Sequence, residues 1–194
     1  KNIIVDIRAQ DDVYEFTSNA MINVVRYMAN ISKNDNDAIP QIVREYHYRV
    51  AKSIKEKMKL QNLDISTLTN QDLYNLAKRS WASGDRMISD AFEYNYEAIF
   101  RAFKQFRYEE AIIFGSNILD IIEKFEHTEK LQEILRVHLL VAQSKINLGL
   151  DASGIDKIIE EAKLIVDKSD SLDIEHWSLV ILNVEADAVI HDHS

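Results

Sequence analysis

Apolar residues recur at helical spacing along most of this chain. One run, between Val13 and Met28, advances in steps of three or four residues and follows Asp11 and Asp12. Aspartate is favoured at a helix N-cap and in the first turn. The pattern therefore predicts a first helix over this run. The apolar stretch 3–7 before it fits either a strand or an extension of that helix.

Two further helices are expected before residue 85. Pro40 is tolerated in the first turn of a helix, and the residues after it are predicted to form one buried stripe. That stripe consists of Ile42, Val43, Tyr46, Val50, Ile54 and Met58. Thr69 and Asp72 fit a capping box that opens a short third helix, and Gly84 is expected to end it.

From residue 86 the pattern changes to long helices in pairs. One pair is predicted over 86–106 and 108–125, and a second pair is joined by a turn at Leu148 and Gly149. A last helix is expected from Asp173. Its apolar side consists of Trp177, Val180, Ile181, Val184 and Ala188, and the chain stops without a partner helix for it. Three alternatives follow: the protein continues past Ser194, this helix serves as the cap, or a second subunit covers its exposed apolar side.

Composition agrees with an all-α chain. Of the 194 residues, 46% are hydrophobic, and only four glycines and one proline interrupt them. A strand-rich fold needs more turn residues. The absence of cysteine removes disulfides and makes a cytoplasmic location the simplest expectation. No apolar run reaches the length of a membrane span, so no membrane partner is expected. The chain begins with Lys1 rather than Met, which fits a fragment of a longer protein.

The segment from Phe103 to Ile112 resembles the turn between the two helices of a tetratricopeptide repeat. In that family an aromatic and a small residue three apart open the second helix, as Tyr108 and Ala111 do here. Ala98 and Ala102 stand where the first helix of the repeat needs small residues. Phe106, however, stands where the repeat usually has glycine, and Ile99 stands at a position that prefers a small residue.

The next pair carries the complementary part of the pattern. Ala142 and Gly154 take small positions in its first and second helices, and Gly149 takes the turn. Asp151 replaces the aromatic residue. Tyr108 and Asp151 are 43 residues apart, against roughly 34 in the standard repeat, so the resemblance implies extended helical hairpins stacked as an α-solenoid. We expect residues 1–85 to form an N-terminal helical region and 86–194 the repeat region, or both to form one continuous domain.

The resemblance implies a non-catalytic scaffold that binds a protein or peptide on a concave face lined by the first helices. It places seven side chains on that face: Tyr96, Phe100, Phe103, Lys104, Arg136, Gln143 and Asn147. An alternative for Phe100 and Phe103 is burial beneath the N-terminal helices. The alternative for Gln143 and Asn147 is simple solvent exposure.

Charge is divided unevenly along the chain. Residues 1–107 hold 16 Lys and Arg against 14 Asp and Glu, a net charge of +2, whereas residues 108–194 hold 7 against 18, a net charge of −11. The acidic half disfavours nucleic acid and favours a basic or neutral ligand. Nucleic acid is expected, if at all, only through the N-terminal region.

No motif indicates catalysis or a cofactor. The histidines have no neighbouring nucleophile at a useful spacing, and there is no glycine-rich phosphate loop. His191, Asp192 and His193 offer metal-ligand chemistry, but a chain end lacks the fixed shell that a metal needs. We therefore expect no enzyme, no metal and no cofactor.

The alternative function is that of a peptide-responsive transcriptional regulator, or its sensor domain, of the Gram-positive quorum-sensing type. The peptide-responsive regulators of Gram-positive bacteria join an N-terminal helix-turn-helix to long helical hairpins, and the segment Leu68 to Leu73 is loosely similar to the opening of that motif. The unpaired last helix also leads us to expect a homodimer.

Overall fold

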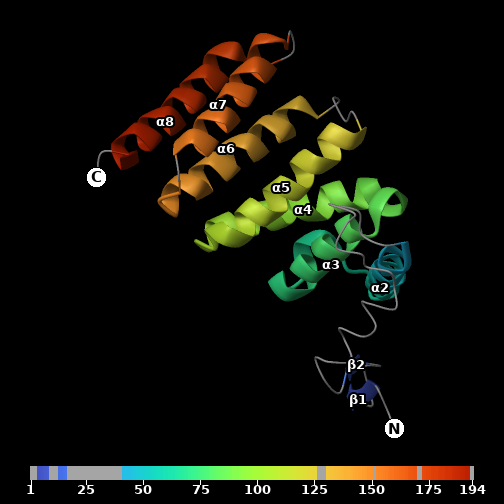
Figure 1. Ribbon diagram of the computed structural model, residues 1–194. Helices are drawn as coiled ribbons and strands as arrows, with labels where there is room; N and C mark the ends of the chain where they lie inside the picture. Colours follow the sequence, from blue (N-terminus) through green and yellow to red (C-terminus); the bar gives the residue numbers. More distant parts are fainter. Residues whose placement is uncertain are drawn as a thin grey trace.

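The computed structural model describes residues 4–8, 13–16, 41–125, 130–150, 152–169 and 172–192. The fold is all-α, as predicted: in this described part, seven α-helices follow a short β-hairpin and pack consecutively (Figure 1). Their bounds are α2 Gln41–Leu60, α3 Asn70–Ala82, α4 Ile88–Lys104, α5 Tyr108–Phe125, α6 Leu131–Asn147, α7 Ala152–Asp167 and α8 Ile174–Asp192. Two 3₁₀ turns, η1 Ile65–Thr67 and η2 Gly84–Met87, flank α3.

The β-hairpin corrects the first predicted helix. Strands β1 Ile4–Arg8 and β2 Val13–Phe16 pair antiparallel, with Ile4 opposite Phe16 and a bulge between Asp6 and Arg8. Both strands are rich in β-branched and aromatic residues, which favour strands. The helical spacing that begins at Val13 is therefore misleading over these four residues, and the remainder of that predicted helix lies outside the described residues.

The second and third predicted helices are present as α2 and α3. At the start of α3, the Thr69 hydroxyl accepts a hydrogen bond from the Asp72 backbone N–H at 3.2 Å. Gly84 follows α3 with a φ of 71°, a left-handed value that glycine adopts without strain. Met58 of the predicted α2 stripe is buried, but Tyr46 is exposed, with the Arg79 guanidinium over its ring. The stripe is thus only partly covered by α3.

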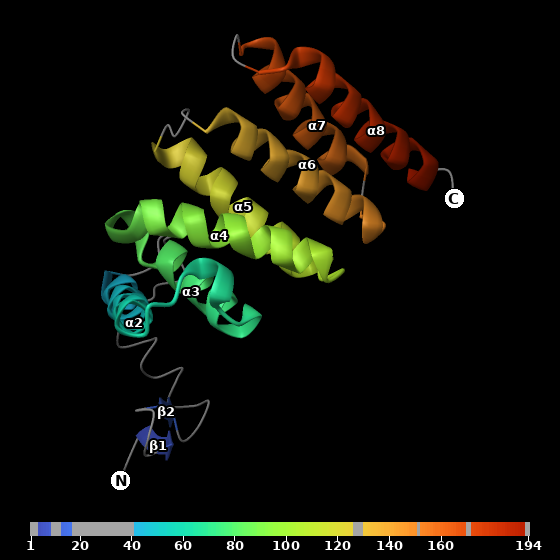
Figure 2. The same ribbon diagram turned by 180° about the vertical axis from the view of Figure 1, so that it is seen from behind.

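The helices from α4 onward repeat at a fixed interval. The first helices α4, α6 and α8 begin at residues 88, 131 and 174, and both intervals are 43 residues. α4 contacts α6 and α6 contacts α8, while α5 and α7 complete the hairpins. We call the surface formed by α4, α6 and α8 the first-helix face. Seen from the opposite side, the stack again runs in chain order from α2 to α8 (Figure 2).

Three helix ends share one turn geometry. Asn62, Phe106 and Gly149 follow α2, α4 and α6 with φ values of 51°, 59° and 64°. After each, the next backbone N–H donates to the carbonyl five residues earlier, at 2.9 Å, 2.9 Å and 3.0 Å. This is the Schellman arrangement. Because α2 ends in the same way and α3 packs directly on α4, the hairpin stack continues across residue 85.

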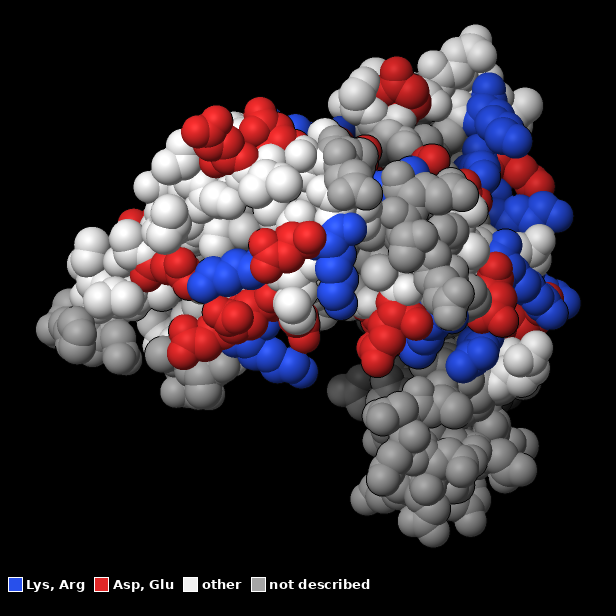
Figure 3. All heavy atoms as spheres, turned by 90° about the horizontal axis from the view of Figure 1, so that it is seen from above, with Lys and Arg blue, Asp and Glu red and all other residues white. Residues whose placement is uncertain are grey.

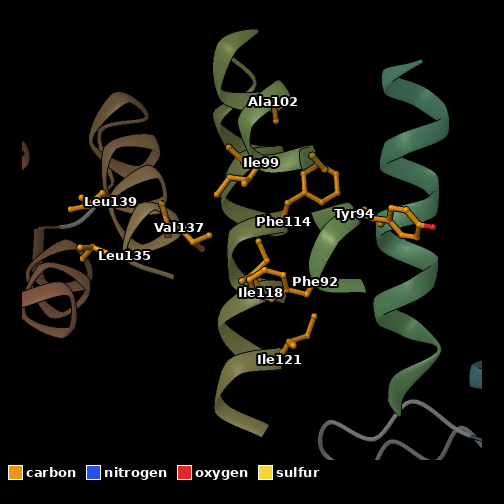
Figure 4. Close-up of a cluster of buried hydrophobic side chains, with 14 of the residues drawn as sticks. Phe92, Tyr94, Ile99, Ala102, Phe114, Ile118, Ile121, Leu135, Val137 and Leu139 are labelled. Carbon is orange, nitrogen blue, oxygen red and sulfur yellow. The ribbon is translucent and has the colours of Figure 1, made fainter. Parts of the chain in front are cut away.

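The core between α4 and α5 depends on small residues. Ala98, Ala102 and Ala111 are fully buried, in agreement with their predicted places in the hairpin. Gly115 allows the closest approach, since a Cβ atom there would lie 2.2 Å from Val141 Cγ2 of α6 and 3.0 Å from Ile99 Cδ1 of α4. Ile99 and Phe114 fill the surrounding space (Figure 4).

Helix α8 exposes a different side from the one that the sequence predicts. Trp177, Ile181 and Val184 are buried, because α8 packs that side against α6 and α7. The prediction that this stripe is uncovered is wrong. The exposed apolar side chains of α8 lie on the opposite side and include Leu179 and Leu182.

Candidate binding face

An aromatic stripe runs along the first-helix face of α4. Phe92, Tyr96, Phe100 and Phe103 are spaced by four, four and three residues and so lie on one side of the helix. Phe92 is buried, and the other three are half-buried. Tyr96 stacks on Phe92 with ring centres 6.0 Å apart and meets Phe100 edge-on at 5.0 Å. These rings form a continuous apolar floor.

Two cations from the α6 hairpin lie over this floor. Lys130 Nζ lies 4.7 Å from the centre of the Phe92 ring, a cation–π contact. The Arg136 guanidinium lies near enough to the Tyr96 hydroxyl to lower its pKa, and it also lies 6.0 Å from the centre of the Trp177 ring. Arg136 therefore links the aromatic stripe of α4 to α8 across the first-helix face.

A cavity of about 310 Å³ opens on the stripe. Its floor comes from α4, one wall from the loop before α3 and the other from the start of α6. The lining residues are Ile65, Ser66, Phe92, Glu93, Tyr96, Glu97, Lys130 and Glu133. A concave apolar surface with a few charged groups at its rim is typical of a ligand site.

The loop wall is held in place by one arginine. Arg101 of α4 donates to the backbone carbonyls of Leu68 and Ile65 at 2.6 Å and of Ser66 at 3.1 Å. Its Nε also pairs with Glu97 at 2.8 Å. Three backbone acceptors and a carboxylate together fix this guanidinium. The 3₁₀ turn η1 and the extended Leu68 after it thus lie against α4, bound to the first-helix face.

A second cavity, of about 410 Å³, lies on the other side of the same loop. It is lined by Lys55, Met58, Lys59, Leu63, Asp64, Ile65, Ser66 and Tyr94. Ile65 and Ser66 line both cavities and so divide one hollow from the other. Lys55, which lines this second cavity, pairs with Asp90 at 2.6 Å and so joins α2 to α4.

Burial sets the ionisation of the tyrosines in this region. Burial raises the pKa of Tyr94 to about 12, with smaller contributions from the Asp90 and Glu93 carboxylates. Burial also raises the pKa of Tyr96, and the Arg136 guanidinium opposes that shift. Both hydroxyls are therefore neutral near pH 7 and act as hydrogen-bonding groups.

The seven predicted residues are only partly brought together. Among the seven, only Tyr96 lines the cavity. Phe100 contacts Tyr96 on the stripe, and Arg136 belongs to α6. Phe103 belongs to the stripe but packs edge-on against Tyr108 at 5.6 Å, near the turn. The remaining predicted side chains lie toward the C-terminal halves of α4 and α6, away from the cavity: Lys104, Gln143 and Asn147. Asn147 donates to the Gln143 carbonyl of its own helix at 2.7 Å.

Several residues of the site were not predicted. Phe92 stands four residues before Tyr96, so the helical spacing alone was sufficient to include it. Lys130 and Glu133 face the stripe only because α6 packs on α4. The loop residues Ile65 and Ser66 reach it only through Arg101, more than thirty residues away in sequence.

Among the described residues, no group of three or more His, Cys, Asp or Glu side chains is placed to hold a metal ion. The side chains of His191, Asp192 and His193 lie outside that part of the chain. Within it, no helix is long and apolar enough to cross a membrane. Comparison with protein-family models, with curated proteins and with solved structures finds no match for this chain.

Proposed function

We propose that this protein binds a polypeptide segment on its first-helix face, over the aromatic stripe of α4, and catalyses no reaction. The observation that supports this most directly is an open cavity of about 310 Å³ whose floor contains the buried Phe92 and the half-buried Tyr96 of the stripe. Aromatic side chains that are incompletely covered offer a large apolar contact area to a ligand.

The loop against α4 supports a polypeptide ligand in particular. Arg101 already binds polypeptide backbone on this face, through the carbonyls of Ile65 and Ser66 in the 3₁₀ turn η1 and of Leu68, the extended residue that follows it. The cavity beside that segment continues the same surface toward α6. An adjacent chain that enters the cavity meets the aromatic floor with one side chain and the loop with its backbone.

The charges at the rim favour a basic ligand. Glu93, Glu97 and Glu133 line the cavity against one cation, Lys130. Glu97 is neutralised by Arg101, whereas Glu93 and Glu133 form no ion pair within the described part of the chain. The net charge of −11 on residues 108–194 acts in the same direction. We therefore assign the ligand as a segment with an apolar anchor flanked by Lys or Arg.

The test begins with selection of peptides from a random display library on the purified protein. A synthetic copy of an enriched peptide is then titrated by calorimetry. We expect enriched peptides to combine an apolar residue with Lys or Arg, and we expect Phe100→Ala to weaken binding by about tenfold or more. Phe106→Ala is the matched control, because Phe106 is 78% exposed and lies off the stripe. Equal affinities for the two variants contradict the proposal.

Nucleic-acid binding is the second candidate, supported by the exposed basic side chains of α2, namely Arg49, Lys52, Lys57 and Lys59. Figure 3 shows Lys and Arg gathered on the side of the molecule where α2 lies. A DNA titration at increasing salt tests this candidate, since phosphate contacts give a steep loss of affinity. α3 itself is packed between α2 and α4, and Arg49 is already paired with Glu45.

A further inference from the structure

Helix α8 carries apolar residues on two opposite sides. Trp177, Ile181 and Val184 are buried against the preceding helices. The other side exposes Leu179, Leu182, Val189 and Ile190 by 57–69% of their surface. A helix of a soluble repeat is usually polar on the side that faces water. The exposed side of α8 is therefore a candidate contact surface.

The exposed residues follow the spacing of a helix–helix seam. Leu179, Leu182, Ala186 and Val189 are separated by three, four and three residues. We call these four residues the α8 seam. This is the spacing of the a and d positions in a coiled coil, where two helices pack along a narrow apolar stripe.

The 43-residue interval shows how equivalent positions are used elsewhere in the stack. Leu139 and Ile146 of α6 stand 43 residues before Leu182 and Val189, and both are buried. In Figure 4 Leu139 points away from α5, toward the side where the later helices lie. The corresponding residues of α4, Tyr96 and Phe103, are half-buried, so of the three first helices α8 leaves these positions most exposed.

The charges beside the seam are compatible with a second copy. The seam residues carry no charge, and Glu185, which flanks them, is paired with Lys163 at 2.5 Å. The other described acidic side chains of α8, Glu175 and Asp187, are exposed and lie outside the four seam residues. Two copies therefore meet without placing an uncompensated Glu185 in the contact.

We propose that the α8 seam is a homodimer interface, in which α8 of one copy packs antiparallel against α8 of a second copy. Leu182 then faces Ala186 of the second copy across a twofold axis, and Leu179 faces Val189. Such a twofold contact uses the same patch twice. The exposed side chains supply on the order of 500 Å² from each copy, so the contact reaches about 1,000 Å² in total, the lower limit of a specific interface.

Sedimentation velocity or light scattering of the 194-residue protein tests this inference. We expect twice the chain mass of 22.5 kDa at about 100 µM, and a single-chain mass for the double variant Leu179→Glu, Leu182→Glu, with unchanged helical circular dichroism. Leu164→Glu is the matched control, since Leu164 of α7 is 51% exposed and lies outside the seam. A monomeric wild type contradicts the proposal, and so does a dimer that survives the double variant.

The orientation has its own test, because the chain has no cysteine. Leu182→Cys and Ala186→Cys are prepared separately and then mixed under mild oxidation. An antiparallel pair brings the two different positions together, so the mixture is expected to form the disulfide between unlike variants fastest. Faster cross-linking of Ala186→Cys with itself indicates a parallel pair and overturns the antiparallel arrangement.

Discussion

Phe106 and Gly149 occupy the same left-handed position at the ends of α4 and α6, with φ angles of 59° and 64°. The two positions are one repeat apart, so the same turn closes both hairpins. Glycine adopts this conformation freely, whereas a side chain with a Cβ atom is strained in it. Phe106 therefore retains a backbone strain that the second hairpin avoids.

Replacement of Phe106 by glycine is expected to stabilise the protein by about 1 kcal/mol, because it removes that strain. The ring is exposed and its contact with Tyr108 is peripheral, so little packing is lost. Chemical denaturation measures the change. Gln105→Gly is the control, since Gln105 has a φ of −97° and gains nothing from glycine; equal effects from both variants rule out the strain argument.

Two glycines of the second helices are expected to respond in opposite ways to alanine. Gly115→Ala forces a methyl group against Val141 and Ile99 and is expected to cost about 1–3 kcal/mol. Gly154→Ala meets only the Lys145 ammonium at 3.4 Å and is expected to stabilise α7 by about 0.5–1 kcal/mol through helix propensity. Thermal melts of the two variants give the comparison. A Gly115 variant as stable as the wild type shows that α5 and α6 are packed less closely than described.

Two buried amides couple three helices. Asn117 of α5 donates to Asn95 Oδ1 of α4 at 2.9 Å, and Asn95 donates to the Ala77 carbonyl of α3 at 3.1 Å. Asn117→Leu leaves a buried acceptor without its donor and is expected to cost about 1–3 kcal/mol. The double variant Asn95→Leu, Asn117→Leu is expected to cost less than the sum of the single changes. Strictly additive free energies of unfolding contradict a coupled pair.

Acid is expected to destabilise the protein through His138. Burial lowers the pKa of this imidazole below 6.5, and Glu161, whose carboxylate lies 3.8 Å away, opposes part of that shift. The unfolded chain then binds more protons than the folded chain as the pH falls below about 6.5, so the free energy of unfolding decreases through that range. Denaturation at pH 7.5 and 5.5 measures this loss. His138→Gln is expected to reduce this loss of stability, leaving the part due to His47, whose pKa burial also lowers. An equal loss in the variant and in the wild type contradicts the assignment to His138.

The sequence was most informative where a local rule acts alone. Tyr108 and Ala111 located the α4–α5 hairpin, and Thr69 located the start of α3, because caps and small packing residues act within a turn or two of the helix. Phe106 stands where the tetratricopeptide repeat usually has glycine. Its positive φ angle explains why glycine is preferred at that position.

The sequence was less informative where contacts are distant or patterns are symmetrical. α8 is apolar on both sides, so spacing alone could not decide whether Trp177 or Leu182 faces the core. The Arg101 contacts with the loop join residues more than thirty positions apart, and no local pattern encodes them. The α2–α3 hairpin lacks the aromatic and small residues of the repeat, and only the turn at Asn62 reveals it.

Hydrogen exchange of the protein with and without a selected basic peptide tests the binding proposal most directly. Bound peptide is expected to slow amide exchange in α4 between Phe92 and Phe103, in the loop at Ile65 and at the start of α6. The outer helices α5 and α7 are expected to exchange unchanged, and Tyr96→Ala is expected to abolish the protection. Protection confined to α5 and α7, or unaffected by Tyr96→Ala, would contradict binding on the first-helix face.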